Sequence, residues 1–328
     1  MVMKAVLDIM LVALVLVIDS DVSPSRGSTD DPAAVPLFAD MQFRRGFLLS
    51  YPDAAMGRQV QAVLTGDPPA GEPAWRLCQW ATKYSLAGVA RTNLPNGDLV
   101  WENAGKRVVV GLGGGDNADL ILDVRGKAEY GDHVRRWGES WPHLLVEQDA
   151  THIHRLSELA AIDLALDLRL LSFEDHMPAD RFDPGLHAAQ FQLFFIVRNI
   201  NRDNGDFNNY IWFGVPFFDS RHDIPPACMA PDAGKKDATG KFICTVDGRQ
   251  VNTTPMKGRQ WVRVRKDLLP HIRQGLAEAA QCGYLRAADP NDFAVFNMNL
   301  GWEIPGAYNA AIQINNFHIT VRSNTASD

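Results

Sequence analysis

The sequence lacks the short signatures of several large enzyme classes. It has no G-x-S-x-G elbow, no Walker-type phosphate loop and no dinucleotide fingerprint, so serine hydrolases of the elbow type and nucleotide-binding enzymes of these types are not expected. It has 4 cysteines in 328 residues, none in a C-x-x-C pair or near histidines at zinc spacing, which argues against a structural zinc site. Basic residues form only short groups such as Arg263 to Lys266 and the net charge is −7, so nucleic acid is not the expected partner.

The composition is that of a globular protein. The 46% of hydrophobic residues and 22% of charged residues exclude wholesale disorder. The length allows one large β-sandwich or two smaller domains. Because no internal repeat and no linker interrupts residues 36–322, we expect a single domain at 36–323, preceded by a leader and linker at 1–35 and followed by a tail at 324–328.

The N-terminus has the pattern of a secretory signal. Lys4 precedes an apolar run from Ile9 to Ile18, and a polar, small-residue segment follows. Asp8 and the lack of a clean A-x-A site leave a strand or a simple leader as the alternative. The run is too short for a transmembrane helix. We therefore expect a secreted protein without a membrane anchor in its mature form.

Four cysteines permit three complete pairings. Cys228 and Cys244 bracket a loop rich in proline, aspartate, glycine and lysine. This pair is the expected disulfide, since disulfides are typical of exported proteins.

The most informative stretch runs from Ala188 to Arg221. Two apolar and aromatic runs flank a polar segment, which predicts a β-hairpin with a long loop. Period-two alternation separates two faces. One face is apolar: Phe191, Leu193, Phe195, Val197, Ile211, Phe213, Val215 and Phe217. The other carries amides, an arginine and rings: Gln190, Gln192, Phe194, Ile196, Arg198, Tyr210 and Trp212. The first face is expected to pack in a core and the second to form a sugar-binding surface.

Most of the remaining chain also predicts strands. Leu159 to Phe173 alternates with period two and is expected to be a long strand, not a helix. Residues 268–283 have helical spacing and end at Gly283, which predicts one short helix. Further strands are expected at 45–51, 75–84, 99–103, 107–112, 118–124, 141–149, 261–264, 293–304 and 310–321, with a glycine turn at 113–117 and a small hairpin at 241–251. The expected fold is an all-β antiparallel sandwich or jelly roll.

Four segments resemble jelly-roll carbohydrate-active proteins, the broad group of lectin-like glucanases, lyases and carbohydrate-binding modules. They are WPHLLVEQ, AQFQLFFIVRN, YIWFGVPFFD and NLGWEIPGAYNAAIQINNFHI. The resemblance covers roughly the second half of the chain and points to no specific family. It implies a polysaccharide or oligosaccharide partner and does not establish catalysis.

Two glutamates are the candidate catalytic pair. Glycoside hydrolysis commonly uses two carboxyl groups, and partial burial raises a carboxyl pKa toward the value that a general acid needs. Glu147 and Glu303 each lie in a predicted strand among aromatic or apolar neighbours. The alternative is that each only hydrogen-bonds a neighbouring strand or loop.

Glycan binding requires flat aromatic surfaces together with hydrogen-bonding groups. The candidate binding residues are Gln190, Gln192, Tyr210, Trp212, Asn297, Asn299, His143, Asp219 and Arg221. In the alternative, Trp212 belongs to the core and the amides pair across strands. Asp219 and Arg221 fit a structural ion pair equally well.

Other polar groups carry weaker signals. Asp163 and Asp167 fit the solvated face of a strand better than a site. His152-x-His154 lacks a third ligand, and the loop from Asn201 to Asp206 lacks the glutamate of a calcium loop, so neither a metal nor a cofactor is predicted.

The favoured hypothesis is an exported glycoside hydrolase with Glu147 and Glu303 on a concave sheet face. A non-catalytic glycan-binding protein would use the same face. A polysaccharide lyase would use His143 or His187 with Tyr210 as base and acid. A structural sandwich that binds no sugar is the remaining alternative.

Overall fold

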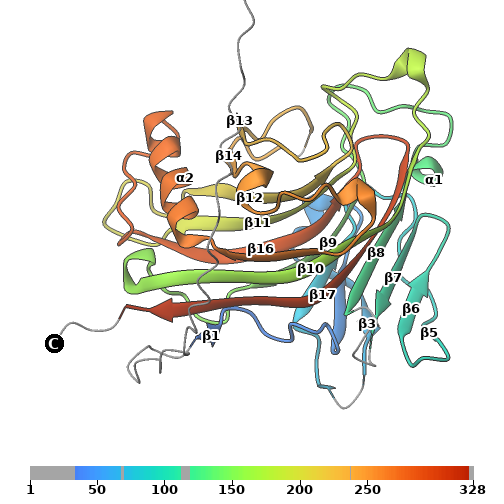
Figure 1. Cartoon of the computed structure of the whole chain (residues 1–328), viewed down its shortest axis with the longest axis horizontal. Coiled ribbons are helices and arrows are strands. Elements are labelled where there is room, and N and C mark those ends of the chain that lie inside the picture. The colour runs from blue at the N-terminus through green and yellow to red at the C-terminus, as the bar shows by residue number, and fades with distance from the viewer. Residues whose placement is uncertain (1–33, 68–69, 112–118, 237, 325–328) are drawn as a thin grey trace, which may run out of the picture. The chain divides into compact units, whose positions relative to one another are not determined.

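Two β-sheets stack face to face in the computed structural model (Figure 1). The structure describes residues 34–67, 70–111, 119–236 and 238–324, all of which belong to one compact unit, Pro32–Asp328. Nearly all of the predicted leader and linker, the glycine turn at 113–117 and nearly all of the predicted tail lie outside the described residues.

The eight-stranded sheet runs in the order β15 (Val262–Asp267), β10 (Leu159–Asp175), β17 (Tyr308–Ser323), β8 (Leu120–Arg125), β7 (Lys106–Val110), β6 (Leu99–Glu102) and β5 (Thr92–Asn93), with β1 (Val35–Pro36) beside β17. The nine-stranded sheet runs in the order β13 (Cys228–Pro231), β14 (Phe242–Thr245), β12 (Tyr210–Asp219), β11 (Gln190–Asn199), β16 (Phe293–Glu303), β9 (His143–Asp149), β4 (Trp75–Cys78), β2 (Gly46–Ser50) and β3 (Val60–Thr65). Neighbouring strands are antiparallel except β2 beside β4 and β12 beside β14. The predicted β-sandwich is confirmed.

The predicted hairpin is the pair β11 and β12, which lie side by side near the middle of the nine-stranded sheet. Its apolar face is buried, with Phe195 and Phe213 as fully covered cross-strand partners. Fully burying a phenylalanine side chain contributes about 1.5–3 kcal/mol relative to exposing it. This fixes the register, because a slip by one residue would turn the whole apolar face toward solvent.

Trp302 of β16 connects the two sheets across the core. Its ring makes edge contacts with Phe191 and Phe218, at centroid distances of 5.1 and 5.7 Å. Its Nε1–H donates to the carbonyl oxygen of Leu122 on β8 of the opposite sheet, at 2.9 Å. Residue 302 therefore points into the core, and its neighbour Glu303 points to the other face of the sheet.

The predicted helix is α2 (Leu269–Gln281), which buries Leu269, Ile272 and Leu276. A second short helix, α1 (Gly126–Tyr130), was not predicted, because five residues are too few to show helical periodicity. Figure 1 shows the two helices at different ends of the sheets. No helix in the part of the chain that the structure describes is long and apolar enough to span a membrane.

The predicted small hairpin at 241–251 forms only in its first half. β14 pairs with β13 and runs parallel to β12, and a 3-10 turn, Gly248–Gln250, follows it. The edge strand β3 was missed because its residues are mostly exposed or half-buried and show no alternating apolar pattern.

The expected disulfide is wrong. Cys228 and Cys244 are free thiols, as are Cys78 and Cys282. Cys228 lies opposite Thr245 and Cys244 lies opposite Met229 in the ladder between β13 and β14. The two cysteines are thus one residue out of register, and their side chains point to opposite faces of the sheet.

Candidate functional site

A cleft of about 820 Å³ lies on the face of the nine-stranded sheet that points away from the core. Every predicted site residue lines it: His143, Glu147, Gln190, Gln192, Tyr210, Trp212, Asp219, Arg221, Asn297, Asn299 and Glu303. Because side chains alternate along a strand, predicting the face of each strand was enough to select residues that meet here.

Cross-strand partners arrange these side chains in rows. The Glu303 row contains His143, Glu303, Gln190 and Asp219, on four neighbouring strands. The Tyr210 row contains Tyr210 and its partner Arg198. Gln190 and Arg198 are eight residues apart on β11, so the two rows are separated by about 26 Å at a rise of about 3.3 Å per residue. The cleft is therefore long enough for several sugar rings.

Glu303 is surrounded by hydrogen-bond donors. Trp141 Nε1 lies 2.9 Å and His143 Nε2 3.5 Å from its Oε2, and Gln192 Nε2 lies 3.3 Å from its Oε1. Burial alone would raise the pKa of this carboxyl group. The interactions with His143 and Trp141, together with the positive charge of Lys235, outweigh burial and lower its pKa to about 2. Glu303 is therefore ionised throughout the physiological pH range.

His143 is held in one orientation. Its Nδ1 lies 2.7 Å from the carbonyl oxygen of Trp141, which can only accept, so Nδ1 carries a proton. Its ring stacks on Trp141 at 5.8 Å and meets the edge of Trp80 at 5.7 Å. This packing keeps Nε2 directed at Glu303.

Glu147 lies between two arginines. Its Oε1 accepts from Arg76 Nη1 at 3.2 Å and from Arg58 Nη2 at 3.4 Å. Burial raises the pKa of Glu147, while the two guanidinium groups oppose this effect. No described residue donates a hydrogen bond to Oε2, which leaves this atom available to a ligand.

Asp149 is the next cleft residue on β9. Arg58 binds both of its oxygens, at 2.5 and 2.6 Å, and Asn297 Nδ2 donates to it at 3.0 Å. Burial works against ionisation here, but the bonds from Arg58 and Asn297 prevail and lower the pKa of Asp149. Arg58 and Arg76 were not predicted as site residues. Arg76 could have been found from its alternating position in the strand at 75–78, whereas Arg58 lies outside any strand and gives no such signal.

The predicted catalytic pair shares the cleft on neighbouring strands, although not in one row. Glu147 is the partner of Asn299, four residues before Glu303, which places the two glutamates about 13 Å apart along the strands. Gly301 lies between them, where a Cβ atom would stand 2.2 Å from the Leu144 carbonyl oxygen. Gln192 is the partner of Gly301 and donates to Glu303 Oε1, while Trp141 and His143 hold its Oε2.

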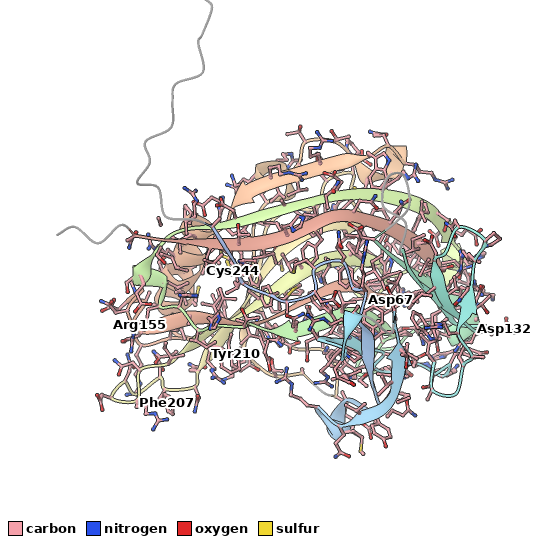
Figure 2. All side chains as sticks on the ribbon, turned by 90° about the horizontal axis from the view of Figure 1, so that it is seen from below. Asp67, Asp132, Arg155, Phe207, Tyr210 and Cys244 are labelled. Carbon is pink, nitrogen blue, oxygen red and sulfur yellow. The ribbon has the colours of Figure 1, made fainter. Side chains whose placement is uncertain are left out.

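An aromatic group occupies the far end of the cleft. The ring of Trp212 meets Tyr210 at 5.7 Å and Phe194 at 6.1 Å, both edge-on. Its Nε1 donates to Thr239 Oγ1 at 3.2 Å. In Figure 2, Tyr210 lies in the half of the protein where Phe207 and Arg155 are labelled, away from Asp132 at the other end. Trp212 is thus a half-buried cleft residue and not part of the core.

Asp219 and Arg221 form an ion pair, with Nε–Oδ1 at 2.9 Å and Nη2–Oδ2 at 2.6 Å. Gln190 Nε2 also donates to Asp219, at 3.0 Å. Arg221 donates in addition to the Pro184 carbonyl oxygen. The pair therefore fixes the end of β12 and orients the Gln190 amide at the wall of the cleft.

The lyase arrangement does not form. His187 is buried outside the cleft, between the Asp183 amide and the Arg135 carbonyl oxygen, at 2.9 Å from each. His143 belongs to the Glu303 row, about 26 Å along the sheet from Tyr210, so these two side chains cannot act on the same bond.

Asp163 and Asp167 lie on β10 of the other sheet. They pair there with Arg322 at 3.0 Å and with Arg265 at 3.1 Å. Both aspartates lie outside the cleft, which agrees with the sequence-based interpretation of a solvated strand face.

No protein-family model matches the sequence, and no curated protein matches it. Among solved structures, the chain is similar to endoglucanase Cel12A of Rhodothermus marinus, with 11% identity and a TM-score of 0.36, covering 72% of this chain and 97% of that one. It is similar to the family 11 xylanase of Neocallimastix patriciarum, with 9% identity and a TM-score of 0.35, covering 71% and 94%. It is also similar to endoglucanase 3 of Trichoderma harzianum from family GH12, with 10% identity and a TM-score of 0.34, covering 72% and 95%. These glycoside hydrolases belong to the group that the four sequence segments resemble. TM-scores this low carry no inference about the reaction, which has to come from the cleft itself.

Proposed function

We propose that the cleft binds a segment of a polysaccharide and hydrolyses one of its glycosidic bonds. The observation that carries the proposal is the pair Glu147 and Glu303, two carboxyl groups in one cleft whose pKa values are shifted in opposite directions. Such divergence is how active sites assign an acid and a base role to chemically similar groups.

Glu303 is the ionised partner in this proposal. With a pKa of about 2 it is a weak base, so its main contribution is to stabilise the positive charge that develops on the sugar ring in the transition state. It also orients the attacking water and accepts its proton when the new bond from carbon to oxygen forms.

Glu147 is the proton donor. Arg58 and Arg76 hold its Oε1, which leaves Oε2 to protonate the leaving oxygen as the glycosidic bond breaks. The proton given by Glu147 and the proton taken by Glu303 balance the hydrolysis.

The spacing of the two glutamates favours inversion. Retaining enzymes need carboxyl groups about 5–5.5 Å apart, and inverting enzymes leave about 6.5–9.5 Å for a water molecule. The strand positions lie about 13 Å apart, which is far beyond the separation of a retaining pair and closer to that of an inverting pair. We expect the product to form with inverted anomeric configuration.

The experiment is a polysaccharide panel read for new reducing ends and for the ultraviolet absorbance of unsaturated products. We expect reducing ends without unsaturated products, and loss of turnover in Glu303→Gln and Glu147→Gln. Glu72→Gln, an exposed glutamate outside the cleft, is the matched control and should retain activity. Full activity in both cleft variants would overturn the assignment.

Export is part of the proposal, on the basis of the signal-like pattern at Lys4 to Ile18. N-terminal sequencing of protein recovered from the culture medium tests it. A protein that stays in the cells with its N-terminus intact contradicts it.

A non-catalytic glycan-binding protein is the second candidate. One observation favours it: the carboxylates of Glu147, Asp149 and Asp219 are each held by an arginine side chain. Such fixed, neutralised acids suit hydrogen bonding to sugar hydroxyls. Saturable oligosaccharide binding without new reducing ends or unsaturated products would establish this function instead.

A further inference from the structure

Arg198 is a cation in the cleft without an acidic partner among the residues that the structure describes. It projects from β11 at the Tyr210 row, and its guanidinium carbon lies 3.3 Å from the centroid of the Phe296 ring. Its Nε is buried and has no hydrogen-bond partner. The planar group is thus positioned by an aromatic face while its hydrogen-bond donors are left unused.

The other cleft arginines differ in this respect. Arg58, Arg76 and Arg221 each pair with a carboxylate within 3.2 Å. Asp149 contributes an attractive charge to Arg198, but Arg58 already binds both of its oxygens.

A second cation lies at the same end. Lys241 Nζ is 2.8 Å from Asn209 Oδ1 and 5.2 Å from the centroid of the Tyr210 ring. It has no ion pair within the described part of the chain. Asp232 lines the same end of the cleft and contributes a negative charge at Tyr210, which offsets Lys241 and leaves Arg198 as the cation without an ion-pair partner in the described part of the chain.

A third group nearby also lacks a partner. Asn297 is 3% exposed and lines the cleft. Its Nδ2 donates to Asp149, while its buried Oδ1 accepts no hydrogen bond. Asn297 is the partner of Ile196, two residues before Arg198 on β11, so an unsatisfied acceptor and an unsatisfied donor both lie in this part of the cleft, where a bound ligand would satisfy them.

The geometry points to an acidic glycan as the ligand, with a carboxylate or sulfate ester of the chain bound by Arg198 at the Tyr210 row. A guanidinium group donates two parallel hydrogen bonds to such anions, and a partly buried, unpaired cation is costly unless a ligand neutralises it. Asn297 Oδ1 accepts from a neighbouring sugar hydroxyl. This inference rests on the proposed glycan-binding function and names its substrate class.

The test is calorimetric binding to the full chain carrying Glu303→Gln, which prevents turnover. The probes are oligosaccharides of alginate, polygalacturonate and ι-carrageenan, each beside its carboxyl-reduced or desulfated counterpart. We expect tighter binding of an acidic probe than of its neutral counterpart. Arg198→Gln should lower the affinity for the acidic probe by about 10- to 100-fold, which is the loss expected for a hydrogen-bonded charge pair. The affinity for the neutral probe should not change.

Two further variants exclude a merely structural effect. Arg202→Gln removes the same charge from an exposed position outside the cleft and should change neither affinity. Arg198→Lys keeps the positive charge but loses the two parallel N–H donors of the guanidinium group. Its affinity for the acidic probe should therefore lie between those of the wild type and Arg198→Gln. The carboxylate and sulfate arms tell which anion is bound.

The possible failures are distinguishable. Equal affinity for acidic and neutral probes, or an equal loss of both in Arg198→Gln, overturns the acidic-ligand inference while glycan binding stands. Absence of binding to every probe and to the wider polysaccharide panel overturns the proposed function as well.

Discussion

His143 Nε2 and Glu303 Oε2 lie 3.5 Å apart, as cross-strand partners on β9 and β16. The His143 ring is fixed by the Trp141 carbonyl oxygen, so it cannot turn away when the carboxylate changes its charge. The ionisation of the Glu303 carboxyl group is therefore linked to the free energy of unfolding of the protein.

The first prediction concerns acid stability. The pKa of Glu303 is lowered from 4.5 to about 2, so its contribution to the free energy of unfolding is complete above about pH 4.5 and is lost as the pH falls toward 2. The stability gap between the wild type and Glu303→Gln should shrink by roughly 3 kcal/mol across that range. Urea unfolding at a series of pH values measures it. Glu72→Gln should follow the wild type throughout, and a gap independent of pH would contradict the assigned pKa.

The second prediction concerns the pH dependence of activity. If Glu147 donates a proton, kcat/KM falls as the pH rises through its pKa, which burial places above that of an ordinary glutamate. Arg76 opposes the rise, so Arg76→Met should move the alkaline limb of the profile to higher pH. Stopped assays measure the position of the alkaline limb of the kcat/KM profile. They run from about pH 4 to about pH 9, the range in which such groups titrate.

A control separates this effect from general damage at the site. Arg221→Met removes a cleft arginine that pairs with Asp219, not with Glu147. It should leave the alkaline limb in place even if it lowers kcat. A limb that moves equally in both variants would rule out Glu147 as its source.

The third prediction concerns the aromatic end of the cleft. Trp212→Ala removes a large, half-buried ring beside Tyr210 and should weaken oligosaccharide binding by about tenfold, which corresponds to about 1.4 kcal/mol. Trp261→Ala is the matched control, because Trp261 is 41% exposed and lies outside the cleft. Affinity electrophoresis compares the two. Equal retardation of Trp212→Ala and the wild type would remove Trp212 from the binding surface.

Sequence alone locates the cleft face but not the distances within it. Alternation along β11 and β12 separates Gln190, Tyr210 and Trp212 from the core, because a strand offers only two faces. The partner of Glu147 depends on how β9 registers with β16, two strands that are more than a hundred residues apart in the chain. The separation of the two glutamates along the sheet is therefore a tertiary result.

The same limit explains the missed arginines and the wrong disulfide. Arg58 reaches Glu147 and Asp149 across 89 and 91 residues of sequence, from a segment that is not a strand. Cys228 and Cys244 do lie on neighbouring strands, as their positions suggest, but a shift of one residue in register sends their sulfur atoms to opposite faces. Proximity in the chain indicates neighbouring strands without fixing the direction of their side chains.

The last prediction tests the free thiols. Without a disulfide to break, dithiothreitol should leave Tm unchanged, and alkylation of the unfolded, unreduced protein should modify all four cysteines. In the folded protein the exposed Cys228 and Cys282 should react first. Burial raises the pKa of Cys244 to about 11 and also raises that of Cys78, so both lack the reactive thiolate as well as access. Mass spectrometry of timed iodoacetamide samples gives the order. A protein that accepts only two labels when unfolded without reductant would show that a disulfide has formed after all.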